Sequence, residues 1–216
     1  MSRLIYIINA SLDGFVEDAG GAIDWADPDG VFDVITRLLQ PVGTYLYGRK
    51  TYEAMAYWDA PPESYPSEHR NFARIWQQPN KIVFSRTLTG VSTCNTRIER
   101  NFDLEAIRKL KRESQLDITI GGAELAGLAL EADLIDECHL FLYPIIVGGG
   151  KPAFRHGLRR NLELLETRRF GTGAIHLHYR VQDGSHRARD VYGDAVAEAG
   201  GLGVLGSGST RSPICG

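Results

Sequence analysis

The sequence predicts an α/β fold, a three-layer αβα sandwich whose mixed, mostly parallel sheet ends in an antiparallel hairpin. Short β-branched runs alternate with helical patterns through most of the chain, which is typical of parallel strands joined by helices. Two last runs, 162–170 and 174–181, flank Gly171-Thr172-Gly173 and indicate a closing hairpin. Because central parallel strands are buried on both sides, we expect helices on both faces of the sheet.

The first half of the chain is predicted to contain three strands and three helices. Residues 3–10 form a β-branched run that Ser-Leu-Asp-Gly breaks, which indicates a buried strand and a turn. Apolar residues recur at helical spacing over 29–39, and Pro41 and Gly43 end that helix. The remaining elements are a strand over 44–47, a helix from Lys50 to just before Pro61, a helix over 67–77 and a strand over 81–84.

The second half continues the alternation up to the hairpin. Asn101 or Asp103 can cap a helix that runs to Lys111. A strand over 117–120, a Gly-Gly turn and a helix over 123–131 follow. The apolar stretch 134–147, interrupted by Pro144 and ended by three glycines, is most simply one strand.

We expect one domain over residues 1–182 and a disordered glycine-rich tail over residues 183–216. A chain of 216 residues is long enough for one domain and short for two. The last 34 residues contain few bulky apolar side chains, so burial cannot offset the entropy of ordering them.

Composition narrows the possible partners. A formal net charge of −3 argues against a basic surface for nucleic acid or for anionic membranes. The longest apolar stretches are well short of the roughly 20 residues that cross a bilayer. Cys94, Cys138 and Cys215 are scattered without C-x-x-C spacing, which favours a reducing compartment. We therefore expect a soluble cytoplasmic protein that binds neither nucleic acid nor membranes.

Three strand-to-helix junctions could bind phosphate. In the first, Gly48 permits a tight exit from the strand, and backbone N–H groups at the start of a helix attract anions. Arg49 and Lys50 add positive charge there, and Thr51 adds a hydroxyl. The alternative is a solvated helix start with two surface cations.

The other two junctions are shorter. Ser85 offers a hydroxyl and Arg86 a guanidinium that can hold phosphate through two hydrogen bonds, although an N-cap beside a surface arginine is the alternative. Gly121 and Gly122 let a backbone approach a ligand, although a tight turn without a ligand fits equally well. Because no G-x-G-x-x-G follows a strand, a dinucleotide site here is not of the doubly wound Rossmann type.

Ionisable residues give weaker signals. His176 and His178 lie two apart on a strand and could chelate a metal, but no third ligand has a recognisable spacing, so we expect no metal site. His139 lies in an apolar run and fits a hydrogen-bonded core residue. Asp13 follows the first strand in a turn, where open α/β sheets carry their sites.

Four segments together resemble the dihydrofolate reductase superfamily, namely residues 9–14, 48–53, 81–86 and 120–125. Their order and spacing agree across nearly all of residues 1–182. Segments 11–14 and 133–137 look like the reductase domain of riboflavin-biosynthesis deaminase-reductases, whereas 48–51 and 84–86 look more like dihydrofolate reductase itself. The chain resembles stand-alone bacterial reductases that combine both signatures.

The resemblance implies a dihydrofolate reductase-like fold that binds NADPH in an extended pose. Ala10 would contact the nicotinamide amide through its backbone. The pyrophosphate would lie against a turn with a cis bond between its two glycines, formed by Gly121, Gly122, Ala123, Glu124 and Leu125. The adenosine and its 2′-phosphate would be held beside Gly48 by Arg49, Lys50, Thr51, Ser85 and Arg86.

Two departures from these families concern the substrate. Riboflavin-pathway reductases usually carry a lysine four residues before the motif serine, where this chain has Ile7. Dihydrofolate reductases place a carboxylate on the first helix, and counting back from Gly48 gives Phe32, with Asp33 next to it. Asp13, Asp33 or an ordered water would supply the proton.

We therefore expect an NADPH-dependent reductase that transfers hydride to a C=N or C=O carbon of a small heterocyclic substrate. It resembles 5-amino-6-(5-phosphoribosylamino)uracil reductase. The alternatives are dihydrofolate reductase proper and a nucleotide-binding module without turnover. The expected partner is the small-molecule substrate, and because related reductases often pair, a homodimer is also possible.

Overall fold

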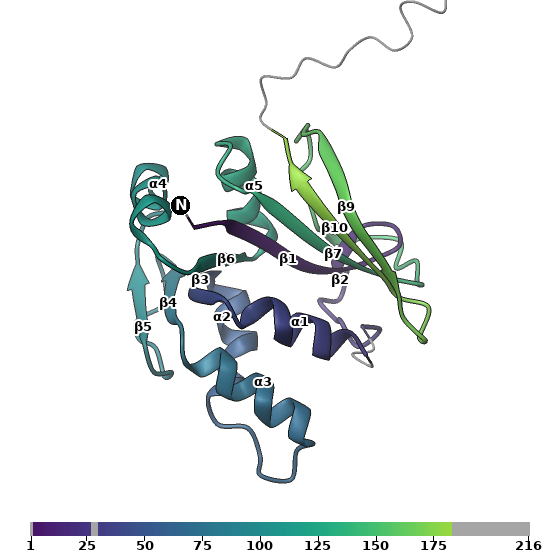
Figure 1. The fold of residues 1–216 in the computed structure, drawn as a ribbon, viewed down its shortest axis with the longest axis horizontal. Coiled ribbons are helices and arrows are strands. Elements are labelled where there is room, and N and C mark those ends of the chain that lie inside the picture. Colours follow the sequence, from purple (N-terminus) through teal and green to yellow (C-terminus); the bar gives the residue numbers. More distant parts are fainter. Residues whose placement is uncertain (1, 27–29, 183–216) are drawn as a thin grey trace, which may run out of the picture. The chain divides into compact units, whose positions relative to one another are not determined.

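The computed structural model describes residues 2–26 and 30–182, which contain one large sheet with helices on both faces (Figure 1). The strands of this sheet are β1 (Leu4–Ser11), β3 (Val42–Gly48), β4 (Asn80–Phe84), β5 (Thr96–Glu99), β6 (Asp117–Gly121), β7 (Glu137–Tyr143), β9 (Leu162–Arg169) and β10 (Ile175–Val181). The helices are α1 (Val31–Leu39), α2 (Arg49–Met55), the 3-10 helix η1 (Ala56–Asp59), α3 (Ser67–Gln77), α4 (Leu104–Glu113) and α5 (Ala123–Glu131). The tail that we expect to be disordered, 183–216, lies outside the described residues.

The sheet has the order β5-β4-β3-β6-β1-β7-β10-β9. The six strands from β5 to β7 are parallel to their neighbours, whereas β10 runs antiparallel to both β7 and β9. This arrangement confirms the predicted mixed sheet with its closing hairpin. The carboxyl ends of β4, β3, β6 and β1 consequently meet at one edge of the sheet.

Alternate residues of β1 show how the two faces are covered. Tyr6 and Ile8 belong to a buried cluster that contains Ala126 of α5, whereas Ile7 faces clusters that contain Val34 of α1 and Phe72 of α3. Figure 1 shows α1 and α3 on one side of the sheet and α4 and α5 on the other. The strand period of two therefore divides one apolar run between two cores, as the three-layer prediction requires.

Helix ends follow local chemistry. Asp103, one of the two caps expected for α4, accepts hydrogen bonds from the backbone N–H groups of Glu105 and Ala106 at 2.9 and 3.5 Å. This cap satisfies donors that the first helical turn leaves free.

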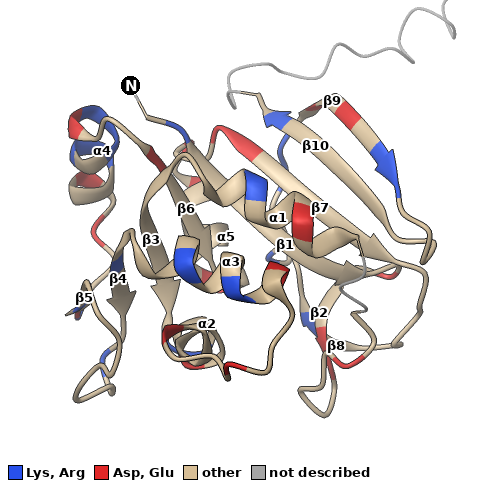
Figure 2. Cartoon of the chain, turned by 60° about the horizontal axis from the view of Figure 1, so that its bottom comes forward, with Lys and Arg blue, Asp and Glu red and all other residues tan. Residues whose placement is uncertain are grey.

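The helix surfaces carry both Lys and Arg and Asp and Glu (Figure 2). Within the described residues, no helix is both long and apolar enough to cross a membrane.

The apolar stretch 134–147 contains a shorter strand than we expect from the sequence. β7 occupies only its middle part, and Leu134 instead follows α5, with its N–H donating to the carbonyl oxygen of Ala129 at 2.9 Å. Pro144 ends the strand because it has no N–H to donate to a neighbour. Apolar composition alone does not distinguish the buried loop before β7 from the strand itself.

Three short strands were not predicted. They are β5 and the two strands of a separate small sheet, β2 (Phe15–Asp18) and β8 (Gly150–Pro152). β8 depends on glycine, because Gly150 has a φ of 139° and a Cβ there would lie 2.0 Å from the carbonyl oxygen of Glu17. Of the three glycines at 148–150, Gly150 takes part in this backbone pairing, where it is opposite Asp18. Such short polar segments lack the apolar alternation that identifies strands.

Candidate functional site

The three phosphate-binding candidates follow the carboxyl ends of adjacent parallel strands. Gly48 at the end of β3 is in register with Phe84 of β4, and Tyr47 is in register with Gly121 of β6. The segments 48–51, 85–86 and 121–125 therefore lie side by side at one edge of the sheet. This is the edge at which open α/β sheets bind ligands.

Two of these junctions touch. A Cβ on Gly121 would lie 2.9 Å from Cγ2 of Thr51, and a Cβ on Gly122 would lie 3.1 Å from its Oγ1. The first distance is too short for a side chain, and the second is tight at a residue whose φ of 103° already favours glycine, so the two glycines allow the turn after β6 to pack directly on the start of α2. Gly48 in turn lies against Leu125, whose Cδ1 would be 3.8 Å from a Cβ on that glycine. The result is a narrow surface made largely of backbone.

The start of α5 completes this surface. Its N-cap residue, Gly122, has φ 103° and ψ 121° and makes no side-chain cap hydrogen bond. The first N–H groups of the helix therefore have no side-chain acceptor, and together with the helix dipole they attract an anion. Ala123 is buried at this start, whereas Glu124 is exposed.

The expected cis bond between Gly121 and Gly122 is not found. None of the peptide bonds among the described residues is cis. The chain makes the turn instead through the positive φ of Gly122, a conformation open to glycine because it has no Cβ.

Exposed cations surround the backbone surface. Arg49 Nε lies 3.8 Å from a Glu53 carboxylate oxygen, and Lys50 Nζ lies 3.5 Å from one of Glu17. Arg49, Glu53 and Lys50 are about half or more exposed, so both pairs are weak, although Glu17 is only 25% exposed. Arg86 is exposed and makes no ion pair with another described residue. These side chains remain available to an anionic ligand at low energetic cost.

The loop after β4 is fixed by contacts that the sequence did not indicate. The hydroxyl of Ser85 accepts hydrogen bonds from the N–H groups of Thr87 and Leu88 at 3.3 and 3.0 Å. Arg100 donates to the carbonyl oxygens of Ser85 and Leu88 at 2.9 and 2.7 Å. Ser85 thus shapes a turn that leads to β5. No helix begins at this position, so the predicted strand-to-helix junction and its N-cap alternative are both wrong here. Arg100, which no motif singles out, holds that turn in place.

Asp13 fastens the turn after β1 to the glycine loop. Its carboxylate accepts hydrogen bonds from the N–H groups of Val147 and Gly148 at 3.2 and 2.8 Å. A hydrogen bond with the Ser11 hydroxyl, followed by these backbone bonds, lowers the pKa of Asp13 below its ordinary value. The carboxylate is therefore charged at neutral pH. Ala10, which precedes this turn, is buried at the end of β1.

The two candidate positions on α1 point in different directions. Phe32 packs against His69 and Phe72 with tilted rings, whose centroids are 4.6 and 4.7 Å away. Asp33 has a side chain that is 60% exposed and forms an ion pair with Arg37 one turn later. The position obtained by counting from Gly48 is thus a half-buried aromatic residue, and the neighbouring carboxylate lies in solvent.

Comparison with known proteins agrees with this architecture. The model of the RibD C-terminal domain family matches residues 3–176. The uncharacterized protein YyaP of Bacillus subtilis is 34% identical over 181 residues, which cover 82% of this chain and 94% of YyaP.

Two solved structures share the fold at low sequence identity. A Thermotoga maritima protein described as a diaminohydroxyphosphoribosylaminopyrimidine deaminase/5-amino-6-(5-phosphoribosylamino)uracil reductase has a TM-score of 0.61 at 16% identity, over 84% of this chain and 57% of that one. Dihydrofolate reductase from Enterococcus faecalis has a TM-score of 0.57 at 15% identity, over 84% of this chain and 97% of that one. The predicted dihydrofolate reductase-like fold is therefore confirmed.

Proposed function

Because the chain belongs to the RibD C-terminal domain family, we propose that it is an NADPH-dependent reductase of a small heterocyclic substrate. Membership supports a reductase of the RibD type. The cofactor and the substrate are our proposal. The observation that carries it is the contact between two glycine-containing junctions, which forms a surface of free backbone N–H groups flanked by exposed arginines.

The residues at this edge fit a phosphorylated dinucleotide. A side chain on Gly121 or Gly122 would occupy the space beside Thr51, so the backbone is open to a pyrophosphate only because both residues are glycine. The uncapped start of α5 would hold the pyrophosphate. Arg49, Lys50 and Arg86 would hold the adenosine 2′-phosphate, since charge-assisted contacts to phosphate are strong and geometrically specific.

When bound, NADPH would supply the hydride, and the protein would align the nicotinamide with the substrate. The backbone of Ala10 at the end of β1 would position the nicotinamide amide. Asp13, by holding Val147 and Gly148, would fix the loop that lies beside this end of the strand. A fixed loop of this kind would restrict the bound substrate to poses in which its reacting carbon faces the nicotinamide.

An ordered water is the proton source that we propose. Of the two candidate carboxylates, Asp13 is kept ionised by its hydrogen bonds, and Asp33 is exposed and paired with Arg37. An ionised carboxylate accepts rather than donates a proton at neutral pH. Water at the end of β1 would therefore deliver the proton, and Asp13 would hold the neighbouring loop at Val147 and Gly148 in place.

The substrate that we propose is a pyrimidine related to the one in the name of the Thermotoga reductase, without strong recognition of a ribose phosphate. Ile7 occupies the position where riboflavin-pathway reductases usually carry a lysine, and its side chain packs among apolar residues of the α1 face. The chain therefore has no positive charge at this position to bind the phosphate of a ribose-phosphate substrate.

The test is a titration of the full-length chain with NADPH and NADH, followed by fluorescence, and then an absorbance assay of NADPH oxidation with candidate heterocycles. We expect NADPH to bind at least about tenfold more tightly than NADH, because one charge-assisted contact stabilises by about 1.5–3 kcal/mol. Turnover of dihydrofolate with tight methotrexate binding would favour the folate alternative. Binding without oxidation of any substrate would favour the non-catalytic module, and failure to bind either nucleotide would overturn the proposal.

A further inference from the structure

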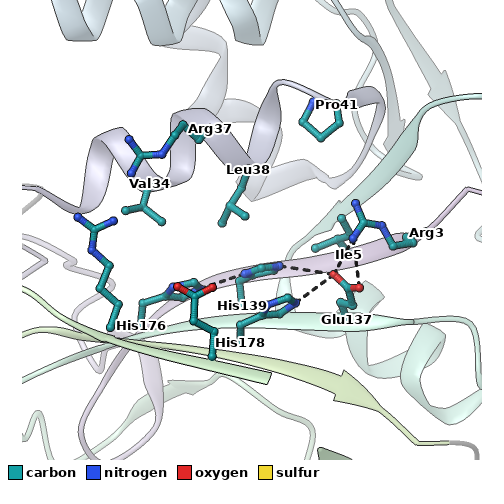
Figure 3. Close-up of a pocket in the computed structure, with 12 residues that line it drawn as sticks. Arg3, Ile5, Val34, Arg37, Leu38, Pro41, Glu137, His139, His176 and His178 are labelled. Atoms are coloured by element: carbon teal, nitrogen blue, oxygen red, sulfur yellow. Dashed lines mark hydrogen bonds and ion pairs between the residues drawn. The ribbon is translucent and has the colours of Figure 1, made fainter. Parts of the chain in front are cut away.

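A second group of ionisable side chains lies on the α1 face of the sheet, near the amino end of β7. Glu137 and His139 are two apart on β7, and His178 of β10 is the direct cross-strand partner of His139. This register directs all three side chains to the same face. Figure 3 shows them converging beneath α1, and one ligand atom from each lies within 4.8 Å of the others. The nucleotide junctions, in contrast, follow the carboxyl ends of β3, β4 and β6.

The spacing of the three ligand atoms suits a small divalent cation. A Glu137 carboxylate oxygen, Oε2, lies 3.1 Å from Nε2 of His178 and 3.9 Å from Nε2 of His139. A tetrahedral zinc site with bonds of about 2.0–2.1 Å places neighbouring ligand atoms about 3.4 Å apart. The rings of His139 and His178 are stacked with centroids 4.0 Å apart, so they must tilt for both lone pairs to reach one ion.

The hydrogen bond of His139 prepares its other nitrogen for a metal. Nδ1 of His139 lies 3.0 Å from Nε2 of His176. When His139 donates this bond, its Nε2 carries the lone pair that faces Glu137. Metal-ligating histidines usually engage their second nitrogen in such a bond, which fixes the tautomer and the ring orientation.

Burial separates these ligands from bulk water. The side chain of His139 is 3% exposed, and those of His178 and Glu137 are 18% and 13% exposed. Two imidazoles with one carboxylate give the kind of ligand set found in three-residue zinc sites.

Three arginines, Arg3, Arg37 and Arg168, line the cavity and oppose a cation, and Arg3 does so most directly because it contacts Glu137. Its guanidinium lies 3.2 Å from both carboxylate oxygens of Glu137. The same guanidinium forms an ion pair with Asp117, which supplies a compensating charge. Glu137 can therefore keep Arg3 on Oε1 while Oε2 faces the two histidines, an arrangement in which Arg3 orients a metal-binding carboxylate.

A cavity of about 320 Å³ opens directly above the three ligands. Val34 and Leu38 of α1 line it from the opposite side, together with Arg37. Zinc sites with three protein ligands keep a fourth position for water or a substrate. We propose that Glu137, His139 and His178 bind a divalent transition-metal ion such as Zn²⁺, with one coordination position open to this cavity.

The experiment is a titration of the chelator-treated full-length chain with Zn²⁺ in competition with a chromophoric chelator, without nucleotide. We expect one equivalent to bind to the wild type. His178→Gln and Glu137→Gln should each weaken that binding at least about tenfold, and His176→Gln should weaken it about 10–100-fold as a supporting residue. His156→Gln, at an exposed histidine outside the cavity, is the matched control and should leave it unchanged.

Thermal unfolding of each variant checks that it is folded. His178 is only partly buried, so its substitution keeps the test usable if Glu137→Gln does not fold. Absence of a stoichiometric ion in the wild type, or equal affinity in the wild type and His178→Gln, would overturn the metal site. Because nucleotide is absent, neither result depends on whether the chain is an NADPH reductase.

Discussion

The nucleotide junctions and the histidine cavity belong to the same sheet but are assembled in different ways. Each junction is a run of consecutive residues, and parallel pairing of β4, β3 and β6 brings the runs together. In the cavity, Glu137 and His178 are 41 positions apart and meet only because β10 turns back along β7. A junction therefore leaves a local motif in the sequence, whereas the cavity leaves isolated histidines.

Their surroundings differ as well. The junctions combine free backbone N–H groups with exposed arginines whose charge does not change near neutral pH. The cavity combines a carboxylate with histidines, of which His139 and His176 are buried and have a lowered pKa. The junctions should consequently respond to backbone volume and to salt, and the cavity to pH and to metal ions.

The largest expected effect is the loss of the contact between the two junctions. Gly121→Val places a side chain against Tyr47 and Thr51, where a Cβ would lie 2.8 and 2.9 Å from their atoms. We expect about 3 kcal/mol of destabilisation, measured by urea unfolding, and a loss of detectable NADPH binding. Gly90→Val is the matched control, since nothing lies within 4 Å of a Cβ at that position. Normal nucleotide binding by Gly121→Val would show that the packed glycines are not the binding surface.

The next effect is a loss of folding stability at low pH that comes from His139 in the cavity. The pKa of His139 is lowered by burial from the ordinary value of 6.5 to about 3, so between these values the unfolded chain binds a proton that the folded chain does not. This contribution to stability is complete above about pH 6.5 and decreases as the pH falls toward 3. From pH 7 to pH 5 we expect His139 to account for a loss of about 2 kcal/mol.

Urea unfolding at both pH values, with a chelator present, measures this loss. His139→Gln should reduce the pH dependence, whereas His156→Gln should retain it. The same pH dependence in all three proteins would contradict a buried neutral His139.

The sequence was sufficient to predict β3, β4 and β6 and the glycine- or cation-containing segments that follow them, because these strands are short apolar runs bounded by turn residues. The order of the strands in the sheet came only from the structure. The sequence also predicted α4 from apolar residues at helical spacing, with Asn101 or Asp103 as the cap, and the structure shows that the cap is Asp103. The sequence was not sufficient for β2, β5 and β8, which are short and polar, or for the exact length of β7. It also could not pair Glu137 with His178, because the register of the hairpin decides which residues face each other, and a shift by one residue would separate them.

A smaller effect should separate the two cofactors. Arg86→Ala removes an exposed guanidinium that we assign to the 2′-phosphate, so NADPH affinity should fall about tenfold while NADH affinity changes less than about twofold. Isothermal titration at low and moderate salt measures both, and the difference should shrink as salt increases. Arg112→Ala on α4, another exposed arginine, is the control. Equal losses for both nucleotides would place Arg86 away from the 2′-phosphate.

The smallest effect distinguishes a positioning residue from a proton donor. Asp13→Asn keeps an oxygen that can accept a hydrogen bond from Gly148 but removes the charge that these contacts favour. If Asp13 orients the loop and water supplies the proton, kcat should fall less than about tenfold and KM should rise by a similar factor, because loosening a positioning loop affects both. Removal of a general acid costs about 10²–10⁴ in rate. Steady-state kinetics with the substrate found by screening would decide, since a loss of that size in kcat with an unchanged KM would return the proton to Asp13.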